Sequence, residues 1–231
     1  MSTRDPRKPV QVADEIAALD AERGEAAARA WWGRVPLLVT HPRRVFVALR
    51  DSDDADVHAR SEPLLAIVIV AGMAGILLTP AWGRLLDDPT VDGLVVAVVT
   101  FIGGVFYGAA GYFLLGLAVW LGARGMGSPE PFRLGRQLVG FSALPLALSL
   151  LITLPVIAVA FGGDWFRSGG ADEGAAGWAV LGIGFAALSW SCGLLALGLR
   201  TTFRLPWRGV VGAIALAAVL VAALGVLPSV L

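Results

Sequence analysis

Five long stretches of the chain contain no charged residue, and they determine the predicted architecture. Each stretch holds at least 21 residues, and about 20 apolar helical residues are enough to cross a hydrocarbon core about 30 Å thick. A helix in a soluble bundle keeps a polar face, whereas these stretches are apolar all round. The uncharged stretches are residues 63–83, 93–123, 137–163, 174–199 and 209–231.

This pattern predicts an all-α, polytopic membrane protein: a bundle of five transmembrane helices with a cytoplasmic amphipathic N-terminal segment. We divide the chain into that segment, residues 1–62, and a five-span membrane domain, residues 63–231. Tryptophans near the predicted ends support the boundaries, because an indole ring is favoured between hydrocarbon and headgroups. The second stretch is long, yet its halves would be too short to cross, which favours one tilted or kinked helix. The predicted spans are near residues 64–86, 94–121, 139–161, 178–199 and 210–231.

The charges are balanced in number but not in position. The chain has 18 basic and 18 acidic residues, and a net charge of zero argues against a nucleic-acid partner. When the connecting segments are assigned to alternate sides of the membrane, sixteen of the 18 basic residues fall on the side of the N-terminus. The positive-inside rule then predicts a protein of the cell (inner) membrane with a cytoplasmic N-terminus and an external C-terminus. Because no secretory leader pattern precedes the first span, we expect that span to direct insertion.

The N-terminal segment has an amphipathic character. Apolar residues recur at helical spacing among charged residues over positions 10–30, and a tryptophan pair and an arginine pair follow. Such residues suit a helix in the headgroup layer, where cations meet anionic lipid. A short helix packed on the protein's own spans is the alternative, and both can hold. The predicted interfacial anchor residues are Trp31, Trp32, Arg43, Arg44 and Phe46.

The third predicted span carries the most informative pattern. Two prolines and a row of hydroxyl residues on one helix face occur in it, and such hydroxyls bond to the backbone or across to a neighbouring helix. They also help to satisfy the carbonyl groups that proline frees. We interpret the span as a kinked structural helix or, alternatively, as a functional groove or hinge. The candidate interaction or hinge residues are Gly140, Phe141, Ser142, Pro145, Ser149, Thr153 and Pro155.

Small residues recur four positions apart in two spans, which lets helix backbones approach closely. Gly104 and Gly108 form such a step in the second span, and Ala213 with Ala217 and Ala218 with Ala222 form two in the last span. The pattern fits packing within the bundle or between chains.

The sequence contains no recognisable catalytic, cofactor-binding or metal-binding constellation. Residues 51–62 resemble a calcium loop, but Ala55 and Asp56 stand where that loop needs a ligand and a glycine. The single cysteine, Cys192, excludes a disulfide within the chain. No Asp, Glu, Lys, Arg or His lies inside the uncharged stretches, which argues against a proton-coupled or ion-coupled carrier. We therefore expect no enzyme activity, no cofactor and no bound metal.

These features favour a non-enzymatic integral membrane scaffold or adaptor that organises partners or lipid. Its expected partners are the lipid bilayer and an unidentified membrane or cytoplasmic protein, a second copy of the chain included. The alternative is a permease, or a membrane subunit of a transport system, for a neutral or apolar solute, which the prolines and hydroxyls of the third span suggest. An intramembrane enzyme acting on lipid ranks last, because the spans lack polar groups clustered at one depth.

The pattern resembles the bacterial branch of the Yip domain family, the Ypt-interacting or Rab-interacting five-span membrane proteins. The shared features are a Pro-x-x-x-Phe step before the membrane (Pro42 to Phe46), five spans, and a basic loop leading into a Gly-aromatic-Ser-x-x-Pro entry (Gly140 to Pro145). The resemblance covers about residues 35–231, and tyrosine is usual where Phe141 stands. It implies the fold, the topology and a membrane-embedded interaction protein. Eukaryotic members are implied to bind prenylated small GTPases and shape vesicles, but the arginine-rich composition is typical of a GC-rich bacterium, so that role is not carried over.

Overall fold

The computed structural model describes residues 30–50, 59–77, 93–166, 170 and 173–230, and all regular secondary structure in them is helical. Residues 30–34 also form a helical turn. The predicted amphipathic helix over residues 10–30, except for residue 30, and most of residues 51–62 lie outside the described residues. The elements are α2 (Leu37–Thr40), α3 (Pro42–Arg50), α5 (Ser61–Leu77), α7 (Gly93–Gly125), α8 (Phe132–Ser142), α9 (Leu144–Ala160), the 3₁₀ helix η1 (Gly162–Phe166), α10 (Ala175–Thr202) and α11 (Trp207–Val230).

The all-helical membrane fold is confirmed, whereas the count of five spans stays a prediction. In the described part of the chain, three helical stretches are long and apolar enough to cross a membrane: Ala97–Gly125, Phe132–Ala160 and Ala175–Thr202. Two shorter apolar helices, Ser61–Gly75 and Trp207–Val219, coincide with the predicted first and last spans. The remainder of the first span, residues 78–86, lies outside the described residues.

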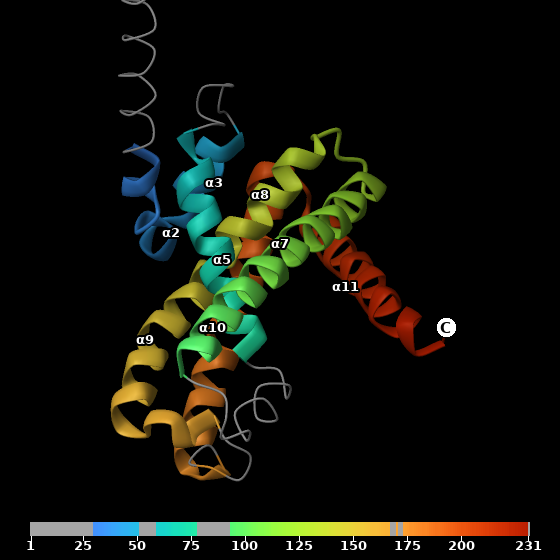
Figure 1. Ribbon diagram of the computed structural model, residues 1–231. Helices are drawn as coiled ribbons and strands as arrows, with labels where there is room; N and C mark the ends of the chain where they lie inside the picture. The colour runs from blue at the N-terminus through green and yellow to red at the C-terminus, as the bar shows by residue number, and fades with distance from the viewer. Residues whose placement is uncertain (1–29, 51–58, 78–92, 167–169, 171–172, 231) are drawn as a thin grey trace, which may run out of the picture.

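α7 is one unbroken helix of 33 residues that crosses α5 obliquely (Figure 1). At about 1.5 Å per residue it is longer than the hydrocarbon core is thick, so it tilts in the membrane or extends beyond the hydrocarbon. The crossing is made by glycines: a Cβ added to Gly72 of α5 would lie 2.5 Å from the backbone nitrogen of Gly108 and would also collide with Gly104. The Gly104–Gly108 step therefore packs within the bundle, one of the two alternatives that the sequence left open.

Two more helices approach α7 through glycine. A Cβ on Gly116 would lie 2.6 Å from the Cα of Arg136 in α8, and one on Gly122 would lie 2.5 Å from the carbonyl oxygen of Ala213 in α11. Ala213 and Ala217 are buried in this contact with α7. Close backbone approach maximises dispersion contacts in a medium where apolar burial gives no net driving force. α7 is thus the helix on which α5, α8 and α11 are assembled.

The third apolar segment begins earlier than predicted and is bent. Helix α8 starts at Phe132, directly after the extended Pro131, rather than near residue 139. The arginines at 133 and 136 ended the uncharged stretch, but α8 is amphipathic and extends the helix through them. At Ala143 the helix breaks, and α9 resumes with Pro145 in its first turn, where the missing N–H is tolerated. α8 and α9 consequently meet at an angle (Figure 1).

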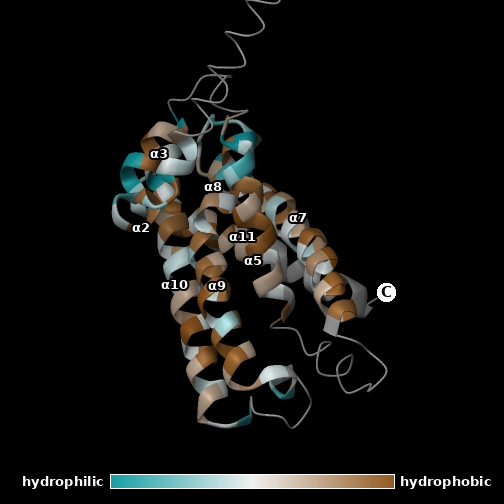
Figure 2. Ribbon diagram, turned by 60° about the vertical axis from the view of Figure 1, so that its left-hand side comes forward, coloured by the Kyte–Doolittle hydropathy of each residue, from teal (hydrophilic) through white to brown (hydrophobic). Residues whose placement is uncertain are grey.

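One end of the bundle collects the basic residues of the described part. The starts of α5, α8 and α11 and the ends of α7 and α10 lie at the end where α2 and α3 sit (Figure 1). Hydrophilic residues gather on α3 and the start of α8, whereas α9 and α10 are mostly hydrophobic (Figure 2). The segments at this end contain Arg34, Arg43, Arg44, Arg50, Arg60, Arg124, Arg133, Arg136, Arg200, Arg204 and Arg208.

Candidate functional site

The headpiece, which we define as residues 30–50, is attached to the bundle through Trp31. This side chain is completely buried and stacks on Phe141 of α8, with ring centroids 5.7 Å apart and an interplanar angle of 22°. The guanidinium carbons of Arg34 and Arg60 lie 4.5 and 5.5 Å from the centroid of the indole ring. Stacking and cation–π contacts both strengthen when solvent is excluded. Trp31 therefore joins the headpiece to the bundle.

Helix α3 supplies the second attachment. Its buried residues Val45, Phe46 and Leu49 form one face, and α3 packs on α10 and α8. Two side chains outside α3 also donate hydrogen bonds to backbone carbonyls of this helix. Arg60 Nη1 donates to the carbonyl of Leu49 at 3.3 Å, and Thr202 Oγ1 donates to that of Phe46 at 3.5 Å. The headpiece is consequently held against two helices at once.

The five predicted anchor residues divide into two groups. Trp31 and Phe46 are buried within the protein, which corresponds to the internal-packing alternative. Trp32 is 44% exposed, and Arg43 and Arg44 are exposed as well. Contact of these three residues with lipid stays a prediction.

The outer face of the headpiece is both apolar and basic. Leu37, Val39 and Val47 are exposed by 36–40%, next to the exposed arginines 43 and 44. A shallow hollow of about 430 Å³ lies here. It is lined by Thr40, His41, Pro42, Arg43, Arg44 and Val47. Exposed apolar residues rimmed by charge are typical of a surface that contacts a protein or a membrane.

The candidate interaction or hinge residues of the third span face different neighbours. Gly140 lies against α5, where an added Cβ would come within 2.5 Å of Leu64 Cδ1, and Phe141 stacks under the headpiece. Ser142 is buried, and its hydroxyl oxygen has no hydrogen-bond partner among the described residues. Pro145 is buried in the first turn of α9. Gly140 thus contacts α5 and Phe141 contacts the headpiece, whereas the role of the four residues as a hinge stays a prediction.

The remaining three residues lie further along α9. Ser149 Oγ donates to the carbonyl of Leu146 at 2.8 Å, and Thr153 Oγ1 donates to that of Ser149 at 2.7 Å. Pro155 is exposed inside the helix. The two hydroxyls thus bond to their own helix rather than across to another.

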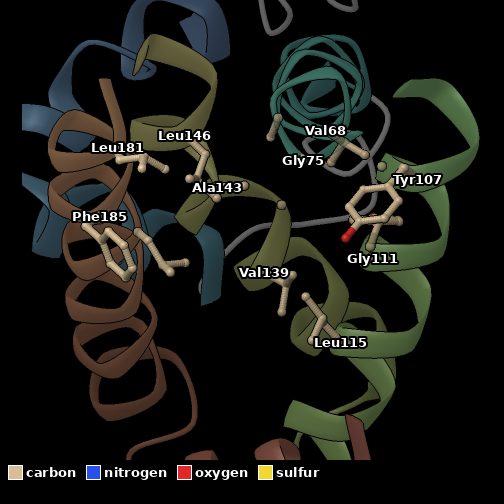
Figure 3. A pocket seen from close by; sticks show the side chains of 17 residues that line it. Val68, Gly75, Tyr107, Gly111, Leu115, Val139, Ala143, Leu146, Leu181 and Phe185 are labelled. Carbon is tan, nitrogen blue, oxygen red and sulfur yellow. The ribbon is translucent and has the colours of Figure 1, made fainter. Parts of the chain in front are cut away.

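An apolar pocket of about 530 Å³ lies between the membrane helices (Figure 3). Leu181 and Phe185 of α10 form one side, Val68 and Tyr107 form the other, and Val139 and Ala143 lie between them (Figure 3). Its lining residues are Val68, Ala71, Gly72, Gly75, Tyr107, Gly108, Gly111, Tyr112, Leu115, Val139, Gly140, Ala143, Leu146, Leu181, Gly184, Phe185 and Leu188.

Of the predicted site residues, only Gly140 lines this pocket. The others were not identified from the sequence, because hydropathy does not tell which helices are neighbours. A signal was present in the glycines: Gly72 with Gly75 and Gly108 with Gly111 repeat at a spacing of three, and all four line the pocket.

In the described residues, no group of three His, Cys, Asp or Glu side chains is placed to hold a metal ion. Cys192 is a free, exposed cysteine on α10.

A protein-family model described as the Yip1 domain matches residues 37–229. No curated protein and no solved structure matches the chain.

Proposed function

This protein belongs to the Yip1 domain family, and from that membership together with the headpiece geometry we propose that it is a non-enzymatic membrane scaffold or adaptor. The family consists of multi-pass membrane proteins that are generally non-enzymatic and is involved in membrane trafficking. In this role, the protein presents a fixed cytoplasmic surface to a partner protein at the membrane.

The observation that carries the proposal is the two-sided headpiece. Its inner side is fixed by the Trp31–Phe141 stack and the buried face of α3. Its outer side keeps Trp32, Arg43 and Arg44 exposed. A surface whose conformation is fixed before binding loses less conformational entropy when a partner docks, so this arrangement suits an adaptor.

We further infer that the protein lies in the inner membrane of a bacterium, with the headpiece in the cytoplasm. The gathering of arginines at the headpiece end supports this orientation through the positive-inside rule. The chain has only one lysine, and that composition supports a GC-rich bacterial source.

The permease alternative receives less support. Its motivation was the prolines and the hydroxyl row of the third span. Ser149 and Thr153 donate to carbonyls of their own helix, and neither they nor Ser142 line the pocket of Figure 3. A solute path would need these groups directed into a cavity.

Crosslinking and mass spectrometry in native membranes test the adaptor role. We expect the full-length protein to crosslink to a defined partner through the headpiece, and the double variant Arg43→Glu/Arg44→Glu to lose that crosslink. The matched control is Arg204→Glu/Arg208→Glu, which reverses two exposed charges at the same end of the bundle. Recovery of an isolated monomer alone, or equal loss in both variants, would contradict the proposal.

A further inference from the structure

We propose that the pocket of Figure 3 binds one anionic phospholipid, with an acyl chain in the pocket and the phosphate at Arg136. The site goes beyond the adaptor role, because it lies among the membrane helices and does not involve the outer face of the headpiece. Binding sites of this kind combine an apolar cavity of about 300–1,000 Å³ with a few polar groups that fix orientation.

The walls of the pocket select an acyl chain. Among the described residues that line the pocket, none has a charged side chain, and the polar side chains are the phenols of Tyr107 and Tyr112. Phe185 is 68% exposed and Tyr107 is 52% exposed, so the pocket opens sideways. The walls belong to apolar helices, so the medium at this opening is bilayer hydrocarbon. An empty cavity forfeits dispersion contacts, and lipid tails are the molecules available to restore them.

The pocket lies between two groups of helices. α7 packs on α5, α8 and α11, whereas α10 packs mainly on α3, α8 and α9. α5 contacts both α7 and α9, and α8 contacts both α7 and α10. Lining residues of α5 and α8 therefore connect the two groups of helices, and α8 runs toward the pocket from the headpiece end.

Arg136 lies on the headpiece side of the pocket. It precedes Val139 and Gly140, two lining residues, by three and four positions and so shares their face of α8. Its guanidinium carbon lies 5.7 Å from the ring centroid of the lining residue Tyr112 and 5.4 Å from that of Phe113. The Arg136 side chain thus borders both the pocket and the lipid-facing surface, since Phe113 is 48% exposed.

The Arg136 side chain has unused donor capacity. Its Nε atom is buried and has no hydrogen-bond partner among the described residues. A buried charged donor without an acceptor is costly, and a phosphate oxygen forms a short charge-assisted bond with guanidinium. The other charged side chains in the segments at this end are predominantly arginines, and no carboxylate lines the pocket to receive a choline group. An anionic headgroup is therefore preferred to a zwitterionic one.

The acyl-chain half of the proposal is tested by filling the pocket. Gly184 lines it, whereas Gly182 on the same helix does not, and an added Cβ meets no atom within 4 Å at either position. The full chain in detergent is titrated with dioleoylphosphatidylglycerol or dioleoylphosphatidylcholine, and bound lipid is counted by native mass spectrometry. We expect Gly184→Leu to reduce bound phosphatidylglycerol at least several-fold and Gly182→Leu to retain it. Gly111→Leu, on the opposite wall at a position where an added Cβ likewise meets no atom within 4 Å, repeats the test should Gly184→Leu misfold.

The headgroup half is tested at Arg136. Loss of one hydrogen bond to a charged group corresponds to roughly a tenfold or greater loss of affinity. The ratio of the affinity for phosphatidylglycerol to the affinity for phosphatidylcholine is therefore expected to fall by about that factor in Arg136→Gln. The control Arg208→Gln removes an exposed charge at the same end. Equal lipid binding by Gly184→Leu and Gly182→Leu, or an unchanged preference in Arg136→Gln, overturns the proposal. Neither result would affect partner crosslinking through the headpiece, so the two proposals fail separately.

Discussion

Trp31 stacks on Phe141 across 110 positions of the chain, with ring centroids 5.7 Å apart. This contact joins the first described turn of the headpiece to the last turn of α8. The bend between α8 and α9 follows immediately at Ala143. The headpiece is thus attached at the last turn of α8, directly before the bend of the third span.

The stack predicts that truncating Trp31 lowers the stability of the protein more than truncating the adjacent Trp32. Truncating a fully buried aromatic side chain costs about 3–5 kcal/mol, so Trp31→Ala is expected to lower the stability by that amount. Trp32→Ala, which changes a side chain 44% exposed, is expected to cost about 1 kcal/mol or less, including its bond from Nε1 to Glu62 at 3.3 Å. Unfolding of the purified protein in detergent measures both. Equal losses would show that Trp31 does not fix the headpiece.

The tryptophan pair also shows what the sequence can and cannot predict. Hydropathy and charge placement predict the helices and their boundaries with headgroups, because these depend on local composition. Which of Trp31 and Trp32 is buried depends on a residue of α8 that is remote in sequence. The Gly104–Gly108 step likewise predicts close packing, but only the structure identifies Gly72 as its partner.

The site was predictable only in part for the same reason. Phe141 and Gly140 were singled out by a local motif, and both contact other elements. Tyr112 and Phe185 carry no local signal, because they line a pocket only through the arrangement of α7 relative to α10. The start of α8 was missed because Arg133 and Arg136 interrupted the uncharged stretch without ending the helix.

The crossing of α5 and α7 predicts that two glycine-to-alanine substitutions change the stability of the protein in opposite directions. A Cβ at Gly72 would collide with the backbone of α7, which cannot give way as a flexible side chain can. Overpacking of this kind costs about 1–3 kcal/mol or more, so Gly72→Ala is expected to lower the unfolding temperature in detergent. Gly111→Ala meets no atom within 4 Å and removes a helix-weakening glycine, so it is expected to raise stability by up to about 1 kcal/mol. Similar changes in both variants would contradict the crossing.

Two hydroxyls of the third span, one in α8 and one in α9, predict a second contrast. The Ser142 hydroxyl is buried without a partner among the described residues, and removing such a group is nearly neutral or stabilising. Ser149 Oγ donates at 2.8 Å to the carbonyl of Leu146, and Ser149→Ala is expected to cost about 0.5–1.5 kcal/mol. Thermal unfolding of Ser142→Ala and Ser149→Ala, measured side by side in one detergent, checks this order. A larger loss for Ser142→Ala would indicate that its hydroxyl binds a water molecule or ligand.

The concentration of arginine at the headpiece end predicts the orientation of the protein. Moving arginine across a membrane is costly, so that end is expected to stay in the cytoplasm. Two reporters test this in a Cys192→Ala background, which removes the only cysteine. Arg208→Cys lies at the start of α11, at the headpiece end, and Asp164→Cys lies in η1, at the opposite end of α9 (Figure 1). A membrane-impermeant maleimide added to intact cells is expected to label Asp164→Cys alone, and to label Arg208→Cys only after permeabilisation. The reverse pattern would show that the headpiece faces outward, and the cytoplasmic adaptor role would fail with it.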